Sequence, residues 1–193
     1  IQYNTTLSNI SENGGIIILD WRGIAWFLAS QSYVHHFYRY IYNMQSNTIS
    51  RLDMAGYLDA NYRDYIIDGV ASKQYKDLFF LQNDIEDIST PCVIIRVNIS
   101  DYNTPVFKQA ITLTGLVDCY GLGYDYQNSR ILFSSYGVDG YDLYSLGITD
   151  ENTMDTVPTL VKSGIGTKSV KNDYNGFFLS KYGNTGANYG FID

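Results

Sequence analysis

The stretch from Asp118 to Tyr144, DCYGLGYDYQNSRILFSSYGVDGYDLY, is the part of the sequence that is most informative about the fold. Two strand-like runs, Arg130 to Ser135 and Tyr141 to Leu146, are joined by a glycine-containing segment, which is typical of a β-hairpin. Turn-rich segments flank both runs, so the tyrosines of this stretch are expected near the loop ends of a sheet. The tyrosines are Tyr120, Tyr124, Tyr126, Tyr136, Tyr141 and Tyr144.

A cluster of tyrosines at loop ends is suited to binding. Each side chain offers a flat apolar ring that can stack on a sugar and a hydroxyl that can form hydrogen bonds, with few rotatable bonds to immobilise. More than half of the 19 tyrosines are nevertheless expected to pack within sheets, so the prediction concerns a subset. The residues predicted to bind a ligand are Tyr124, Tyr126, Tyr136, Tyr141, Trp21, Asp125, Asp139 and Asp142.

The composition favours strands throughout the chain. The 193 residues include 19 tyrosines but only 3 prolines, and lysine is scarce, which favours strand over helix. We therefore expect one all-β domain over residues 1–193, an antiparallel β-sandwich of jelly-roll type. At most one or two short helices are expected, one of them between Thr48 and Gln82. No repeat with a blade-like period is evident, which argues against a propeller.

Further strands are predicted from alternating or apolar runs elsewhere in the chain. The main ones cover residues 33–42, 92–99, 110–117 and 177–179. Trp26 lies within an apolar run and is expected in the core, whereas Trp21 stands among polar residues and glycine and is expected nearer the surface.

The charge excludes two classes of partner. A formal net charge of −7 disfavours nucleic acid and anionic membrane surfaces, because both require positive charge on the protein. The longest apolar region, Ile16 to Ala29, is interrupted by Asp20 and Arg22 and is too short to span a bilayer. A neutral or cationic partner fits this balance better. The chain begins with Ile1, so we expect a domain excised from a longer protein.

Cysteine and histidine give no metal-binding pattern. Cys92 and Cys119 are expected to be buried free thiols, with a cross-strand disulfide as the alternative. His35 and His36 are neighbours on a predicted strand and point to opposite faces, so they cannot share a metal ion. The acidic segment 83–87 lacks the glycine and terminal glutamate of an EF-hand loop, which leaves a solvated turn or an irregular calcium site. No metal and no cofactor are predicted.

No catalytic signature is present. The sequence has no nucleophile elbow and no Walker loop, and the run from Gly121 to Gly123 does not complete a dinucleotide fingerprint. Glycoside hydrolysis needs two suitably spaced carboxylates, and turn aspartates are too numerous to single out a pair. We predict non-catalytic binding. A structural or protein-interaction β domain and a glycan-degrading enzyme remain as alternatives.

Three segments resemble a known family. GLGYDYQNSRILFSSYG (Gly121 to Gly137), VDGYDLYSLG (Val138 to Gly147) and DYNGFFLSKYG (Asp173 to Gly183) resemble the carbohydrate-binding modules carried by siphophage tail-tip proteins. They are similar in particular to the modules inserted in the "evolved" distal tail protein of phages that infect lactic-acid bacteria. The resemblance implies a jelly-roll sandwich on the virion, outside the cell. Presented on an oligomeric tail ring, it would attach the phage tail to host cell-wall saccharide.

Overall fold

β-strands make up all the regular secondary structure in the part of the chain that the structure describes, and all but one of their pairings are antiparallel. The computed structural model describes residues 15–22, 24–31, 34–43, 48–53, 66–84, 87, 89–138, 140–165, 169–173, 176–180 and 190–191. The all-β class is thereby confirmed, and the described residues include no helix at all between Thr48 and Gln82. It follows that no helix in the described ranges is long and apolar enough to cross a membrane.

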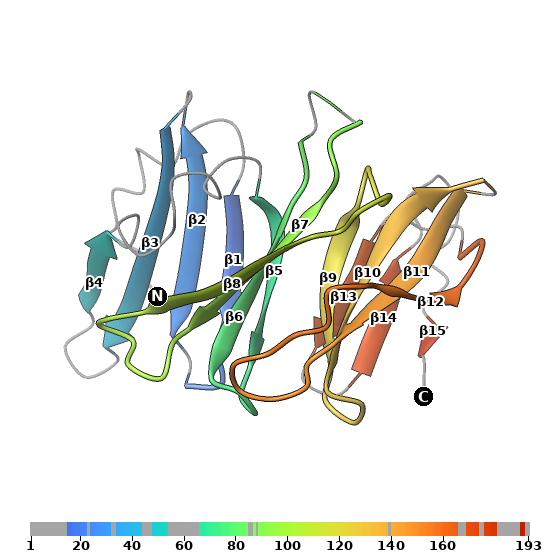
Figure 1. Cartoon of the computed structure of the whole chain (residues 1–193). Coiled ribbons are helices and arrows are strands. Elements are labelled where there is room, and N and C mark those ends of the chain that lie inside the picture. Colours follow the sequence, from blue (N-terminus) through green and yellow to red (C-terminus); the bar gives the residue numbers. More distant parts are fainter. Residues whose placement is uncertain are drawn as a thin grey trace.

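The first two sheets are four-stranded meanders in which each strand pairs with the next along the chain (Figure 1). One contains β1 (Gly15–Leu19), β2 (Ala25–Gln31), β3 (Val34–Asn43) and β4 (Thr48–Asp53). The other contains β5 (Ile66–Ser72), β6 (Asp77–Gln82), β7 (Val93–Asn98) and β8 (Val106–Thr112). The neighbouring histidines, His35 and His36, both lie in β3, where a strand was predicted.

The third sheet begins with the same meander and is then extended. It contains β9 (Tyr120–Asp125), β10 (Arg130–Gly137), β11 (Gly140–Gly147) and β12 (Thr159–Lys162). Beyond β9 it continues through β13 (Ser169–Asp173), β14 (Gly176–Ser180) and β15 (Gly190–Phe191). The step from β9 to β13 is parallel and pairs Leu122 with Lys171, whereas the other pairings are antiparallel.

The sheets stack through their first strands. β1 packs against β5, and β5 packs against β9. An added Cβ at Gly69 of β5 would overlap the side chain of Ile18 in β1, so glycine permits this close approach. Successive first strands begin about 50 residues apart, an interval found in propeller repeats. Stacked four-stranded meanders resemble consecutive blades of a β-propeller, an arrangement that the sequence did not indicate.

Two apolar clusters fill the spaces between the sheets. Phe79 and Leu81 of β6 belong to the cluster between the second and third sheets, whereas Leu78 and Phe80 belong to the cluster against the first sheet. Neighbouring residues of a strand point to opposite faces, so β6 is buried on both sides and its sequence reads as a continuous apolar run. Trp26 is fully buried, as predicted. The predicted sandwich, with sheets packed face to face, is confirmed.

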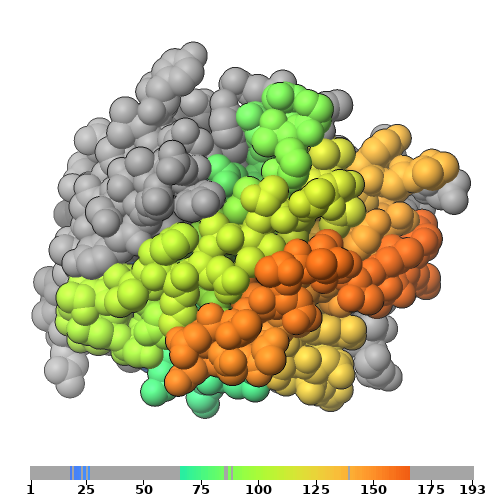
Figure 2. All heavy atoms as spheres, in the orientation of Figure 1, coloured from blue at the N-terminus to red at the C-terminus, as the bar shows by residue number. Residues whose placement is uncertain are grey.

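Two arginine–aspartate pairs, one partly exposed and one fully buried, tie neighbouring sheets together. Arg22 pairs with Asp20 beside β1 and donates to the carbonyl oxygen of Ile99 after β7, at 2.9 Å. Arg96 pairs with buried Asp77 at 2.6 Å and donates to backbone carbonyls of the connection between β11 and β12. That connection and β8 lie side by side on one face of the molecule (Figure 2), where Lys108 donates to the carbonyl oxygen of Glu151.

Two details of the predicted fold are wrong. The first two sheets and strands β9 to β12 of the third are up-and-down meanders, so the strand order differs from that of a jelly roll, in which strands cross between sheets. The strand predicted over residues 110–117 ends at Thr112, because the chain turns at Thr114 and Gly115, the latter with a φ of 82°. The connecting segment 113–119 brings Asp118 and Cys119 to the start of β9.

Candidate functional site

The hairpins of the third sheet carry tyrosines at both of their ends. In β10, Arg130 pairs with Asp125 of β9 at one end, and Gly137 pairs with Gly140 of β11 at the other. We call the first the turn end, after the 126–129 turn, and the second the disulfide end, because Cys119 lies beside it. The structure therefore separates the predicted ligand-binding residues: Tyr124, Tyr126 and Asp125 lie at the turn end, whereas Tyr136 and Tyr141 lie at the disulfide end.

At the turn end, Tyr124 is a core residue. It is 1% exposed, and its ring stacks on Phe79 with centroids 6.1 Å apart. Its hydroxyl donates to Gln74 Oε1 at 3.0 Å, and burial raises the pKa of Tyr124 to about 12. A side chain buried in this way cannot serve as a platform for a ligand, so the prediction for Tyr124 is wrong.

Asp125 is used by its own turn. Its carboxylate accepts hydrogen bonds from the backbone of Gln127 and Asn128 and from the side chain of Arg130, the last at 2.7 Å. Burial alone would raise its pKa, but the hydrogen bonds from Asn128 and Arg130 outweigh burial and hold the pKa of Asp125 below its ordinary value. Asp125 thus closes the turn, and its predicted role in binding is not supported by its contacts.

Tyr126 and Trp21 lie apart from the disulfide end. Tyr126 is partly exposed, and its ring stands edge-on to Tyr124 at 4.6 Å. Trp21 belongs to the β1–β2 turn, where the Arg22 guanidinium lies 4.8 Å from the centre of its ring and 5.6 Å from that of Tyr102. These contacts place Trp21 in a separate aromatic group with Tyr102.

The two remaining predicted aspartates have different outcomes. Asp142 accepts a hydrogen bond from the backbone N–H of Gly164 at 2.8 Å, and its carboxylate occupies the space beside Gly137. It therefore anchors the segment that follows β12. Asp139 lies outside the described residues.

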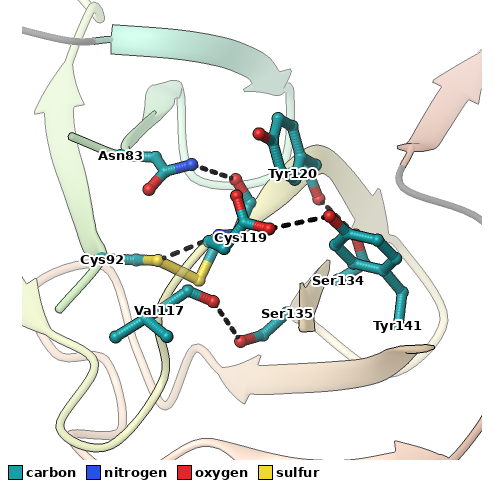
Figure 3. Close-up of a disulfide and its surroundings, with 9 residues drawn as sticks. Asn83, Cys92, Val117, Cys119, Tyr120, Ser134, Ser135 and Tyr141 are labelled. Atoms are coloured by element: carbon teal, nitrogen blue, oxygen red, sulfur yellow. Dashed lines mark hydrogen bonds between the residues drawn. A yellow bond between two sulfur atoms is a disulfide. The ribbon is translucent and has the colours of Figure 1, made fainter. Parts of the chain in front are cut away.

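The disulfide end holds a compact group of side chains that we call the tyrosine cluster: Asp118, Tyr120, Tyr136 and Tyr141. Figure 3 shows Tyr120 and Tyr141 of this group beside Cys119. The Tyr141 hydroxyl donates to Asp118 Oδ2 at 2.8 Å. Tyr120 and Tyr136 both stand nearly perpendicular to Tyr141, at 77° and 74°, with centroids 5.8 and 5.5 Å away. Tyr141 is 8% exposed, whereas Tyr136 is 60% exposed. The cluster therefore combines a buried tyrosine, whose hydroxyl is hydrogen-bonded to Asp118, with the exposed ring of Tyr136.

The segment that carries Asp118 is anchored on both sides. Ser135 Oγ donates to the carbonyl oxygen of Val117 at 2.8 Å, and Ser134 Oγ donates to that of Tyr120 at 2.9 Å. Asn83 Nδ2 donates to the carbonyl oxygen of Cys119 at 3.0 Å. Asp118 itself has a φ of 49°, a left-handed conformation that aspartate tolerates better than most residues. These contacts fix the direction of the Asp118 carboxylate.

Cys92 and Cys119 form a disulfide next to the tyrosine cluster (Figure 3). Both residues are fully buried, as predicted, but the preferred expectation of free thiols is wrong. Backbone hydrogen bonds of Cys92 with Leu116 and Leu113 bring the 113–119 segment alongside the start of β7, so the two sulfur atoms meet. The sequence did not favour this pairing, because Cys92 and Cys119 are 27 residues apart and precede strands of different sheets.

The Tyr120 and Tyr141 hydroxyls remain protonated at neutral pH. Burial, followed by the hydrogen bond and the charge of Asp118, raises the pKa of Tyr120 and of Tyr141 above the ordinary tyrosine value. Neutral hydroxyls can donate to a carboxylate or to a ligand. Such a group can therefore bind and orient a polar molecule.

The described residues give no group that could hold a metal ion. Within the ranges that the structure describes, no three histidine, cysteine, aspartate or glutamate side chains come together to hold a metal ion. Of the acidic segment 83–87, Asp84 accepts a hydrogen bond from the backbone N–H of Asp87, while Ile85 and Glu86 lie outside the described residues.

The comparisons with known proteins inform the fold alone. No family model matches the chain, and no curated protein matches it. Among solved structures, a chain in the crystal structure of a nidogen/laminin complex is similar, with a TM-score of 0.52 and 12% sequence identity. The similarity covers 86% of this chain and 54% of that chain, so this chain spans about half the length of its structural neighbour. At 12% identity, this similarity indicates a shared arrangement of the strands and nothing further.

Proposed function

We propose that this domain binds a saccharide on a cell surface, without catalysis, through the tyrosine cluster. The observation that carries the proposal is the exposed ring of Tyr136 next to the hydrogen-bonded pair of Tyr141 and Asp118. A sugar ring can stack on an exposed aromatic face while its hydroxyl groups donate to a carboxylate. The packing of Tyr136 against Tyr141 holds this face in place before the ligand arrives, which lowers the entropic cost of binding.

The disulfide supports an extracellular setting for this binding. Disulfides persist in oxidising environments and are rare in proteins of the reducing cytosol, and Cys92 and Cys119 are paired here. Attachment of a phage tail to its host, as the sequence resemblance implies, is the setting that we propose. Several copies on an oligomeric tail ring would strengthen weak individual contacts through avidity.

The positions of the carboxylates at the disulfide end support binding of a saccharide without its hydrolysis. Glycoside hydrolysis requires two carboxylates that face the same bond. Asp142 follows Tyr141 on β11, and alternation along a strand directs these neighbours to opposite faces of the sheet. Asp142 is also held by Gly164, whereas Asp118 is held by Tyr141. The two aspartates therefore have separate structural partners.

Cell labelling tests the proposal directly. A fluorescent fusion of the domain is applied to Gram-positive cells, with free monosaccharides such as galactose, rhamnose and glucose as competitors. We expect labelling that one simple sugar abolishes and that Tyr136→Ala removes. Tyr126→Ala is the matched control, because Tyr126 is a partly exposed tyrosine at the turn end. A folded domain that labels no candidate host, or Tyr136→Ala labelling like the wild type, would contradict the proposal.

Protein interaction is a second candidate because β12 has exposed apolar residues. β12 lies at the edge of the third sheet, and Leu160 and Val161 are 50% and 37% exposed, next to exposed Val157. Edge strands with exposed apolar residues can pair with another chain. If β12 served in this way, Leu160→Lys would abolish self-association or partner binding and leave sugar competition unchanged. Light scattering over a range of protein concentrations measures the self-association.

A further inference from the structure

We propose that the saccharide bound by the tyrosine cluster carries a positively charged amine, as an amino sugar with a free ammonium group does. This inference rests on the proposed saccharide binding and adds the charge class of the ligand. It depends on the geometry of the tyrosine rings, on the position of the Asp118 carboxylate and on the charge of the whole chain.

The ring geometry suits an organic cation. Tyr120 and Tyr136 each stand at nearly a right angle to Tyr141, with centroids less than 6 Å from it. Each of these two rings is therefore turned by nearly a right angle from the ring of Tyr141. The face of an aromatic ring is electron-rich and attracts a cation, and recognition of ammonium groups by several aromatic rings is a known use of this attraction. A neutral sugar needs only one such face.

The Asp118 carboxylate adds negative charge to this cluster. The Asp118 carboxylate accepts the Tyr141 hydroxyl and also forms a hydrogen bond with Tyr120, yet a carboxylate can accept about four hydrogen bonds in all. Asp20, Asp77 and Asp125 pair with arginine or lysine, whereas no ion pair between described residues involves Asp118. A ligand ammonium beside Asp118 would therefore supply the charge balance that arginine supplies to the other three.

The cluster is open to a ligand on one side. Tyr136 is 60% exposed, the following hairpin residue Val138 is fully exposed, and Asp118 is half-buried. An ammonium bound between the exposed ring and the half-buried carboxylate would lose part of its hydration, which strengthens its attraction to both. The formal net charge of −7 would also draw cationic ligands towards the protein.

Calorimetric titration with matched sugars tests the inference. The probes are glucosamine, N-acetylglucosamine and glucose, together with the corresponding galactose series, so that the amine, acetamide and hydroxyl forms share one ring. We expect the free amine to bind at least about tenfold more tightly than the acetamide, the effect of one charge-assisted hydrogen bond. The preference should shrink as sodium chloride is raised, because salt screens partly exposed charges.

Variants separate the charge from the shape of the site. Asp118→Asn should remove the preference for the amine while neutral sugars still bind, with Asp142→Asn as the control that keeps it. If Asp118→Asn does not fold, Tyr136→Leu on the exposed side keeps apolar bulk but removes the ring, and it should reduce amine binding.

The two proposals fail in different ways. Equal binding of amine and acetamide forms would overturn this inference and keep saccharide binding. Binding of none of the six sugars, together with unlabelled cells, would overturn both.

Discussion

The two ends of the β9–β10–β11 hairpins contain the same kinds of residue and use them differently. Each end has a pair of edge-on tyrosines beside an aspartate: Tyr124 and Tyr126 with Asp125 at the turn end, and Tyr136 and Tyr141 with Asp118 at the disulfide end. At the turn end the aspartate accepts hydrogen bonds from its own turn and from Arg130. At the disulfide end the aspartate accepts the Tyr141 hydroxyl instead.

The difference shows that composition alone does not make a binding site. The second sheet covers Tyr124, and the stacking of Phe79 on its ring leaves no face for a ligand. Tyr136 lies near the end of β10, next to the hairpin turn, and keeps 60% of its surface exposed. The position of each tyrosine relative to the neighbouring sheet therefore decides whether it stabilises the fold or is available to bind.

The largest expected effect comes from truncating the buried tyrosine of the turn end. Tyr124→Ala should lower the free energy of unfolding by about 3–5 kcal/mol, because it leaves a cavity against Phe79. Tyr124→Phe keeps the ring and loses the hydrogen bond to Gln74, for a cost of about 1 kcal/mol. Urea unfolding of both variants measures the two values. An alanine variant as stable as the phenylalanine variant would show that the ring is not packed in the core.

Removing the disulfide should have the next largest effect, and it should act on the disulfide end. The double change Cys92→Ser and Cys119→Ser is expected to cost about 2–4 kcal/mol of unfolding free energy. Loss of the cross-link should also reduce ligand binding, because Cys119 lies between Asp118 and Tyr120. Urea unfolding with and without reductant measures the stability, and the wild type in reductant should resemble the variant. If reductant leaves the wild type unchanged, the thiols are not paired.

Lowering the pH should reduce the stability of the protein, because Asp125 at the turn end becomes protonated. Its pKa is lower in the folded protein than the ordinary value of 3.8, so Asp125 contributes stability above that pH and loses it as the pH falls through the folded pKa. Asp125→Asn should remove about 1 kcal/mol of this dependence, a modest value because Arg130 is partly exposed. Unfolding midpoints at about pH 6 and about pH 3 test this. Parallel losses in variant and wild type would contradict it.

The smallest effect on stability is expected for the exposed tyrosine of the disulfide end. Tyr136→Ala should change the free energy of unfolding by less than about 0.5 kcal/mol, as is usual at the surface, although it should abolish binding of the saccharide. Thermal unfolding and sugar titration of the same sample separate the two properties. A large loss of stability would mean that Tyr136 packs more tightly than its exposure indicates.

Much of the local structure could be predicted from the sequence. Alternating apolar residues and glycine-containing turns correctly located the hairpin of β10 and β11 and most of β7. β9 was missed, because its two glycines, Gly121 and Gly123, are poor strand formers. They lie at the start of the third sheet, where the neighbouring sheets pack closely. Tyr120 was also missed, although its position next to Cys119 would have marked it once the disulfide was known.

The all-β class, the tyrosine-containing hairpin at Tyr136 and the acidic net charge could be predicted from the sequence alone. These follow from local alternation, turn residues and composition, which act over a few residues at a time. Only the tertiary structure decided that the sheets stack through their first strands, that Cys92 meets Cys119, and that Asp118 rather than Asp125 accompanies the exposed ring. Those outcomes depend on contacts between residues far apart in the chain, which are set by the packing of whole sheets against one another.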